Sequence, residues 1–246
     1  MNSIINLTLC QEYFIITNMQ RRNLLFAAVF AIAMAYLEAA VVVYLRKLYG
    51  ITDIMTSLSS FDAQISRIEI GREAATLIML LALGWIAGKK LQSRIGFFIF
   101  AFGVWDIFYY IWLRIFIGWP HALLDWDLLF LIPLPWWGPI LSPVLISLVM
   151  AIIGVQLVMS EARGIAIQPK TAEWLLLVLG ILAMLYAFMA DALALRHLNL
   201  EMLGKLRPSS FQWPIFLAGF ILSVASCGKF LAAVKNDDKA GGRIAT

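Results

Sequence analysis

Charged residues are scarce in this chain of 246 residues. They make up 14% of it, whereas soluble globular domains contain about 25%. Hydrophobic residues make up 62%, against roughly 45–50% in soluble domains. A water-soluble fold cannot bury that much apolar surface, so this class is excluded. A lipid bilayer accommodates it in apolar windows of about 20 residues.

Cysteine and histidine are nearly absent, with two residues of each. Cys10 precedes the first long apolar stretch and Cys227 lies inside the last, so the pair forms neither a disulfide framework nor a thiolate metal site. Two histidines fall well short of the histidine-rich sets of membrane di-iron oxygenases. The net charge of +4 is spread over short Lys/Arg pairs, with no basic patch interleaved with aromatics, and we therefore expect no nucleic-acid partner.

Several enzyme signatures are missing as well. The chain contains no HExxH, no GxSxG and no glycine-rich phosphate loop after a strand. It also lacks a DDxxD box and the paired-glutamate-then-arginine box of CAAX-type proteases. No motif assigns the chain to a characterised family. The cofactor is unknown; a divalent metal held by carboxylates with His121 stays an alternative that no ligand motif supports.

The long apolar stretches predict an all-α, polytopic transmembrane bundle of about six helices. The predicted spans are 24–45, 67–88, 95–117, 139–159, 174–195 and 214–234. Residues 21–235 then form one transmembrane domain. Residues 1–20 show no periodicity and are expected to be a disordered extension or a misassigned start. The polar residues 236–246 are expected to be a disordered cytoplasmic tail.

The segment 118–138 is rich in proline and tryptophan. Its apolar core is too short to span a bilayer. Proline removes backbone hydrogen bonds, and tryptophan favours the membrane interface. We therefore predict a short interfacial or re-entrant segment, with 123–137 as the part that adds a half-span.

The orientation prediction rests on a small excess of Lys and Arg in the loops on one side. This excess places both termini in the cytoplasm, in a membrane of the bacterial inner-membrane type. The side opposite the termini then collects most of the ionisable residues that lie at membrane depth. Such residues cost about 2.5–3.5 kcal/mol each at a helix centre, and they persist where they pair, face water or carry out a function.

Helical spacing suggests that these residues converge. Glu38 lies deep in the first span, within the arc of an alanine stripe that faces protein. Glu69, Arg72 and Glu73 share one helix face at positions i, i+3 and i+4, extended by Thr76.

The third span carries a polar stripe of its own. Asp106, Tyr110 and Arg114 follow one another at i, i+4 and i+8, with Tyr109 beside them. An ion pair of Glu38 with Arg72, or of Asp106 with Arg114, is the structural alternative to a functional site.

The candidate residues fall into two groups. The predicted catalytic residues are Glu38, Glu69, Arg72, Glu73, Asp106 and Tyr110. The predicted substrate-binding residues are Tyr109, Arg114, His121, Asp125, Asp127 and Asp191. No residue is predicted to bind a metal.

Three functions stay open. The first is a membrane-embedded enzyme that acts on a lipidic or small substrate, because buried carboxylates suit proton transfer near neutral pH. The second is a proton- or cation-coupled transporter or channel, in which the same acids bind the ion. The third is a structural or assembly subunit of a membrane complex. Membrane lipid is an expected partner, a homodimer is an open alternative, and the small-molecule or ion ligand is unknown.

Overall fold

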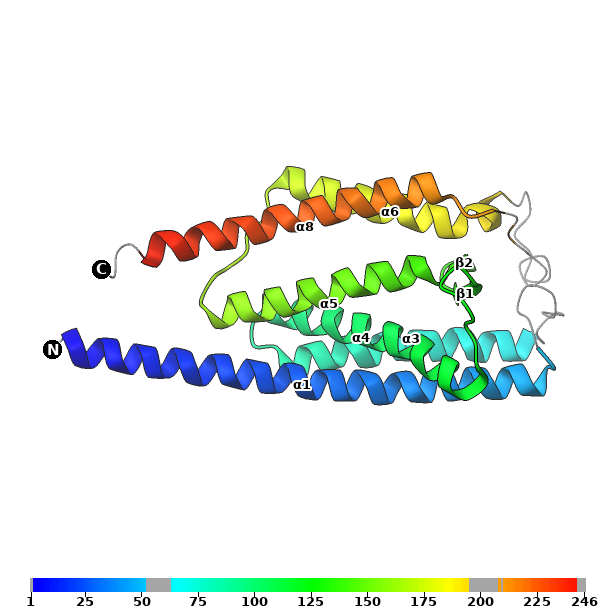
Figure 1. The fold of residues 1–246 in the computed structure, drawn as a ribbon, viewed down its shortest axis with the longest axis horizontal. Helices are drawn as coiled ribbons and strands as arrows, with labels where there is room; N and C mark the ends of the chain where they lie inside the picture. Colours follow the sequence, from blue (N-terminus) through cyan, green and yellow to red (C-terminus); the bar gives the residue numbers. More distant parts are fainter. Residues whose placement is uncertain (1, 52–62, 195–207, 209, 243–246) are drawn as a thin grey trace.

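The computed structural model describes residues 2–51, 63–194, 208 and 210–242. In these residues six long helices form a bundle, and two short strands lie across one end of it (Figure 1). The elements are α1 (Asn2–Leu48), α3 (Ala63–Ala87), α4 (Leu91–Ile117), β1 (Trp126–Phe130), β2 (Trp136–Pro139), α5 (Leu141–Ala162), α6 (Thr171–Leu193) and α8 (Trp213–Gly242). The predicted all-α helical bundle is confirmed.

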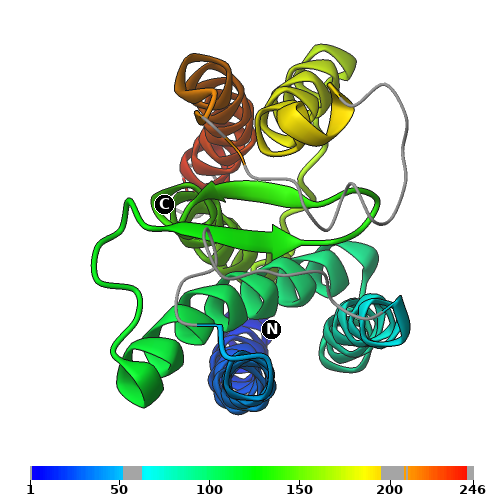
Figure 2. The same cartoon turned by 90° about the vertical axis from the view of Figure 1, so that its right-hand side faces the viewer.

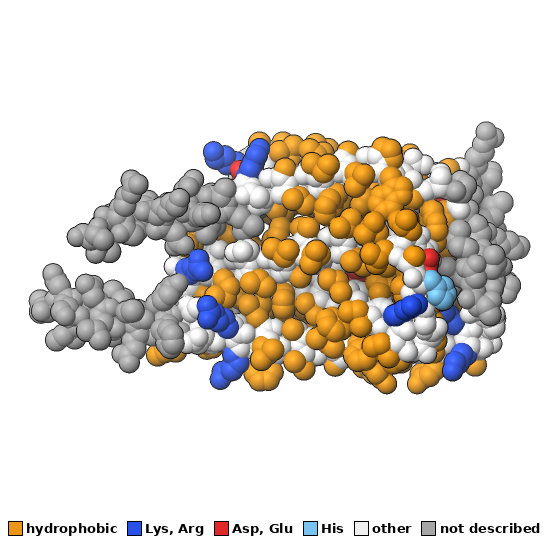
Figure 3. Space-filling model, viewed as in Figure 1, with side chains coloured by type: hydrophobic (Ala, Val, Ile, Leu, Met, Phe, Trp, Pro, Cys, Tyr) orange, Lys and Arg blue, Asp and Glu red, His pale blue; other side chains and the backbone are white. Residues whose placement is uncertain are grey.

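Five helices are long and apolar enough to cross a membrane. Their apolar spans are Ile15–Leu48, Gln64–Ala87, Leu91–Ile117, Leu141–Ala162 and Thr171–Leu193. The apolar part described in α8, Trp213–Lys229, is shorter. Apolar side chains cover the middle of the visible face, and Lys and Arg gather toward its two ends (Figure 3). The chain therefore has the build of a multi-pass membrane protein.

Both ends of the chain are more helical than expected. Helix α1 runs back to Asn2, through residues that we expected to be a disordered extension. No proline or glycine interrupts 2–48, so the sequence contains no local stop signal before Gly50, whose φ is +62°. Helix α8 likewise continues to Gly242, into the tail that we expected to be disordered.

Helix α4 is the centre of the bundle and packs against α1, α3 and α5. On α1 the contact face is an alanine stripe: Ala31, Ala35 and Ala39 are fully buried. Small side chains at a spacing of four residues let helix backbones approach closely in lipid, where dispersion contacts drive association. The stripe therefore fixes which face of α1, and with it Glu38, is turned toward α4.

Glycine allows a second close approach, between α4 and α5. A Cβ atom on Gly103 would collide with the backbone carbonyl of Ser147, and one on Gly154 would lie 2.6 Å from the carbonyl oxygen of Gly96. Helices α6 and α8 form a separate pair that meets the rest of the bundle through α5 and β2.

The segment 118–138 contains strands, which the sequence did not predict. It forms most of a β-hairpin that covers one end of the bundle (Figure 2). The interfacial or re-entrant position of this segment stays a prediction. The strands are antiparallel, with Trp126 opposite Pro139 and an irregularity between Leu128 and Phe130. Pairing each strand with the other satisfies backbone groups that proline would have left free in a helix. The side chain of Asp127 is thereby buried beneath the hairpin.

Candidate functional site

A cavity of about 110 Å³ lies beneath the hairpin, among α1, α3, α4 and β1. Its volume suits several water molecules or a small ligand. Five carboxylates and two guanidinium groups line it: Glu38, Glu69, Glu73, Asp106, Asp127, Arg46 and Arg72. Thr76, Trp105, Tyr109 and Tyr110 contribute further polar atoms, and Leu128 to Leu131 form an apolar wall.

Eight of the twelve predicted site residues line this cavity. They are Glu38, Glu69, Arg72, Glu73, Asp106, Tyr109, Tyr110 and Asp127. The other four, Arg114, His121, Asp125 and Asp191, lie outside it. The structure thus brings these eight residues together at one cavity.

Arg72 connects two helices on one side of the cavity. Its Nε donates to Glu69 Oε2 at 2.8 Å, and its Nη2 lies 2.7 Å from the same oxygen. Its Nη1 forms an ion pair with Glu38 of α1, the pairing that the structural alternative anticipated. The Thr76 hydroxyl also donates to Glu38, at 3.3 Å. These contacts fix α1 against α3.

Glu73 has a different kind of partner. Both of its carboxylate oxygens accept from the backbone N–H of Leu131, at 2.9 and 3.1 Å. Strand β1 ends at Phe130, so this N–H is free of the ladder between the two strands. Glu73 therefore ties α3 to the end of β1.

Asp106 is buried where α4 meets α5. It accepts a hydrogen bond of 2.8 Å from the Ser147 hydroxyl. The alternative ion pair with Arg114 does not form, because the two residues lie about 12 Å apart along α4 and Arg114 turns to the end of this helix. There its Nη1 donates to the carbonyl oxygens of Gly118 and Pro120, the latter at 3.0 Å. Cationic side chains commonly satisfy the last carbonyls of a helix in this way.

Asp127 is the acid of the hairpin and lies outside the membrane-spanning segments. It is 2% exposed, and its Oδ1 is 3.7 Å from Arg46 Nη2. Burial raises the pKa of Asp127 to about 7, while the Arg46 guanidinium and hydrogen bonds from Leu128 and Tyr110 act against this rise. The Arg46 guanidinium itself lies over the Trp119 ring, 4.0 Å from its centroid.

The remaining predicted residues have local structural contacts. Asp125 accepts from the backbone N–H groups of His121, at 2.6 Å, and Ala122, at 3.2 Å, which stabilises a turn. The His121 side chain is exposed. Asp191 is in the last turn of α6.

Sequence reasoning missed Arg46 and Trp105. Arg46 follows Glu38 by eight residues and so falls on the same side of α1, but a cation at the end of an apolar span is also typical of an ordinary flanking residue. Trp105 precedes Asp106 and gave no signal, because tryptophan is common in membrane helices for reasons of packing and interface position.

The cavity combines carboxylates, guanidinium groups and phenolic hydroxyls within one apolar enclosure. With all side chains in their usual charge states it holds three more negative than positive charges, so a proton or a cationic group is needed for balance. No group of three or more His, Cys, Asp or Glu residues in the described part of the chain is arranged to hold a metal ion. Comparisons with protein-family models, with curated proteins and with solved structures find no match for this chain.

Proposed function

We propose that this chain is a membrane-embedded enzyme that moves protons to or from a small or lipid-borne substrate in the cavity beneath the hairpin. The observation that carries the proposal is Asp127. It lines the cavity, is almost fully buried and has a pKa of about 7, so it exchanges a proton near neutral pH. A general base is most effective when its pKa lies near the working pH.

The surroundings of Asp127 suit this role. Tyr110 donates a hydrogen bond to the carboxylate, and Arg46 lies close enough to stabilise its ionised form. Glu73 and Asp106 supply further acidic groups in the same cavity, each held by a neutral donor. The apolar wall formed by Leu128 to Leu131 excludes water and accommodates an apolar part of the substrate.

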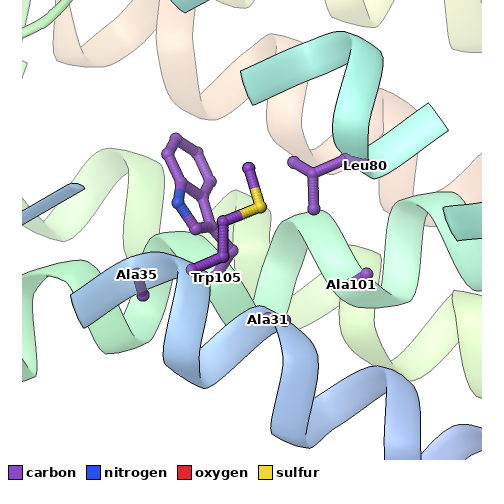
Figure 4. Close-up of a cluster of buried hydrophobic side chains, with 6 residues drawn as sticks. Ala31, Ala35, Leu80, Ala101 and Trp105 are labelled. Carbon is purple, nitrogen blue, oxygen red and sulfur yellow. The ribbon is translucent and has the colours of Figure 1, made fainter. Parts of the chain in front are cut away.

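The floor of the cavity is formed by packed side chains. This favours an enzyme that acts at one face of the membrane over a carrier that needs a path through the bundle. Trp105 lines the cavity and also belongs to a buried cluster with Ala31, Ala35, Leu80 and Ala101 (Figure 4). Those four side chains are fully buried. A substrate therefore enters and leaves from the hairpin end. If both termini are cytoplasmic, as the sequence predicts, this end is the outer face.

A proton- or cation-coupled carrier is the second candidate. The excess of three negative charges favours it, because such a cavity binds protons or cations. The assembly role is the third candidate. It is supported by the contacts of three acids with other segments of the chain, made by Glu38, Glu73 and Asp106. These candidates differ in what the loss of Asp127 does.

The test compares the Asp127→Asn variant with Asp125→Asn. The two aspartates are two residues apart, but only Asp127 lines the cavity. Lipids and small molecules from cells that express each form are compared by untargeted mass spectrometry. We expect a product with the unmodified chain and with Asp125→Asn, and none with Asp127→Asn at equal protein level.

The other outcomes identify the alternatives. No product difference, together with pH-gradient-driven uptake into proteoliposomes that Asp127→Asn abolishes, replaces the enzyme by the carrier. No product and no uptake, with co-purifying partners that are lost on mutation, replaces it by the assembly role. A product that persists in a well-folded Asp127→Asn protein removes Asp127 from the reaction.

A further inference from the structure

The cavity contains buried hydrogen-bond donors that lack acceptors. Arg46 is 8% exposed, and its Nε and Nη2 have no hydrogen-bond partner within the described ranges. The same holds for the indole Nε1 of Trp105, which is 5% exposed. Both side chains line the cavity. Buried polar groups are nearly always paired, so unpaired ones at a cavity wall indicate a ligand that supplies acceptors.

Arg46 is positioned for such a ligand. Its guanidinium plane is held over Trp119 at 4.0 Å, which limits its movement. Asp127 lies 3.7 Å away, within range of electrostatic attraction but beyond a hydrogen bond. The donors of the guanidinium therefore stay available. A planar guanidinium with neighbouring donors matches the two oxygens of a phosphate or carboxylate group.

An anion alone does not suit the rest of the cavity. Five carboxylates line it, and Arg72 is already shared between Glu38 and Glu69. Glu73 accepts from the backbone N–H of Leu131 and is attracted electrostatically by Arg72, which already pairs with Glu38 and Glu69, so among the described residues no side-chain cation is paired with Glu73 alone. A protonated amine beside Glu73 places one positive charge there and compensates for the anionic group that binds Arg46.

We infer that the ligand of this cavity is a zwitterion, with an anionic oxygen group on Arg46 and a protonated amine beside Glu73. This inference rests on the proposed function, because it names the substrate class of the same cavity. The indole N–H of Trp105 serves a further oxygen of the ligand. Phosphoethanolamine has this chemistry, both as a free molecule and as the headgroup of a membrane lipid.

The test uses the full chain in nanodiscs of phosphatidylglycerol, a lipid without an amine. Calorimetric titrations compare phosphoethanolamine, inorganic phosphate and ethanolamine. We expect the zwitterion to bind at least tenfold more tightly than either half, because only the zwitterion engages both Arg46 and Glu73. Arg46→Gln should weaken its binding at least tenfold and leave ethanolamine unchanged. Glu73→Gln should weaken the binding of the zwitterion and of ethanolamine and leave the binding of phosphate unchanged.

Arg114→Gln is the matched control, because Arg114 is at the same end of the bundle but outside the cavity. It should bind all three probes as the unmodified chain does. Arg46→Lys keeps the charge without the paired donors and should show an intermediate loss, which separates recognition from misfolding. Adding phosphatidylethanolamine to the nanodiscs weakens binding of the free probe if the lipid headgroup occupies the cavity, and leaves it unchanged if the ligand is soluble; both results agree with the inference.

Three results overturn the inference. These are equal binding of phosphate and the zwitterion, unchanged binding in Arg46→Gln, and no binding of any probe. The enzyme proposal fails separately, through the Asp127→Asn product comparison. If the zwitterion fails to bind but a product still depends on Asp127, only the inferred substrate class is wrong and the enzyme proposal stands.

Discussion

Glu73 of α3 holds the backbone N–H of Leu131, the residue that follows strand β1, through both carboxylate oxygens at 2.9 and 3.1 Å. The contact joins a membrane helix to the hairpin that covers the cavity. The Arg46–Asp127 pair joins the same hairpin to α1. The cover of the cavity is thus held by the ionisable residues that line it.

Removing the Glu73 carboxylate should loosen the hairpin. We expect Glu73→Ala to destabilise the protein by about 1–3 kcal/mol, because the Leu131 N–H loses a charged acceptor. Hydrogen exchange of 126–139 should accelerate while that of α4 stays unchanged. Glu69→Ala is the control, since Glu69 bonds to Arg72 and has no contact with Leu131. Equal exchange in Glu73→Ala and the unmodified chain would contradict the anchoring role.

Asp127 should titrate near pH 7, in contrast to the value of 3.8 for a free aspartate. Infrared difference spectroscopy should show a protonated carboxyl band that disappears with a midpoint near pH 7. The band should be absent from Asp127→Asn and present in Asp125→Asn. Arg46→Gln should shift the midpoint upward, because the cation that favours the ionised form is gone. A midpoint near 4 would refute the effect of burial.

The same titration sets the pH dependence of stability. The folded-state pKa of Asp127 lies above that of the unfolded chain, so ionisation of this carboxyl opposes folding. The stability that Asp127 contributes in its protonated form is fully present below about pH 4 and is lost as the pH rises to about 7. The groups that act on Asp127 are Arg46 from α1, Tyr110 and Asp106 from α4, and the backbone N–H of Leu128. Denaturant unfolding should show a decline over this window that is smaller in Asp127→Asn.

Mutations of Arg72 and of its partner Glu38 should have non-additive effects on the free energy of unfolding. Arg72→Gln leaves Glu38 and Glu69 without their shared cation, and loss of the partner of such a partly buried charged group costs about 1–3 kcal/mol. Glu38→Gln combined with Arg72→Gln should cost less than the sum of the single changes. Unfolding of the four forms in one detergent gives the coupling energy. Simple additivity would mean that the Glu38–Arg72 pair contributes no interaction energy.

Helical periodicity allowed much of the cavity to be predicted. The positions of Glu69, Arg72 and Glu73 on one face, and of Asp106 and Tyr110 on another, follow from a repeat of 3.6 residues. It was not possible to predict which helices meet, because small-residue packing specifies a close contact but not its partner. Asp106 and Arg114 share one stripe, but eight residues separate them by about 12 Å along the helix, and Arg114 donates to the carbonyl oxygens of Gly118 and Pro120 instead.

The hairpin is a second feature that could not be predicted from the sequence. Asp125 and Asp127 looked equivalent on either side of Trp126, yet one stabilises a turn and the other is buried. A strand places alternate residues on opposite faces, and this difference becomes visible only once the strand is known. Five strand residues rich in Trp, Leu and Phe resemble a short piece of buried helix, so the local pattern did not reveal it.

Two glycines in neighbouring helices should respond oppositely to alanine. A Cβ atom on Gly103 would meet the backbone of Ser147 and lie 2.9 Å from the nitrogen of Ala151, and neither backbone group can move aside. Gly103→Ala should separate α4 from α5, lengthen the Asp106–Ser147 hydrogen bond and cost about 1–3 kcal/mol. At Gly71 of α3 a Cβ atom meets nothing within 4 Å. Gly71→Ala should therefore stabilise the chain by about 0.5–1 kcal/mol through the better helix propensity of alanine. Unfolding midpoints in detergent measure both changes, and a shift of the same sign would contradict the close packing of α4 on α5.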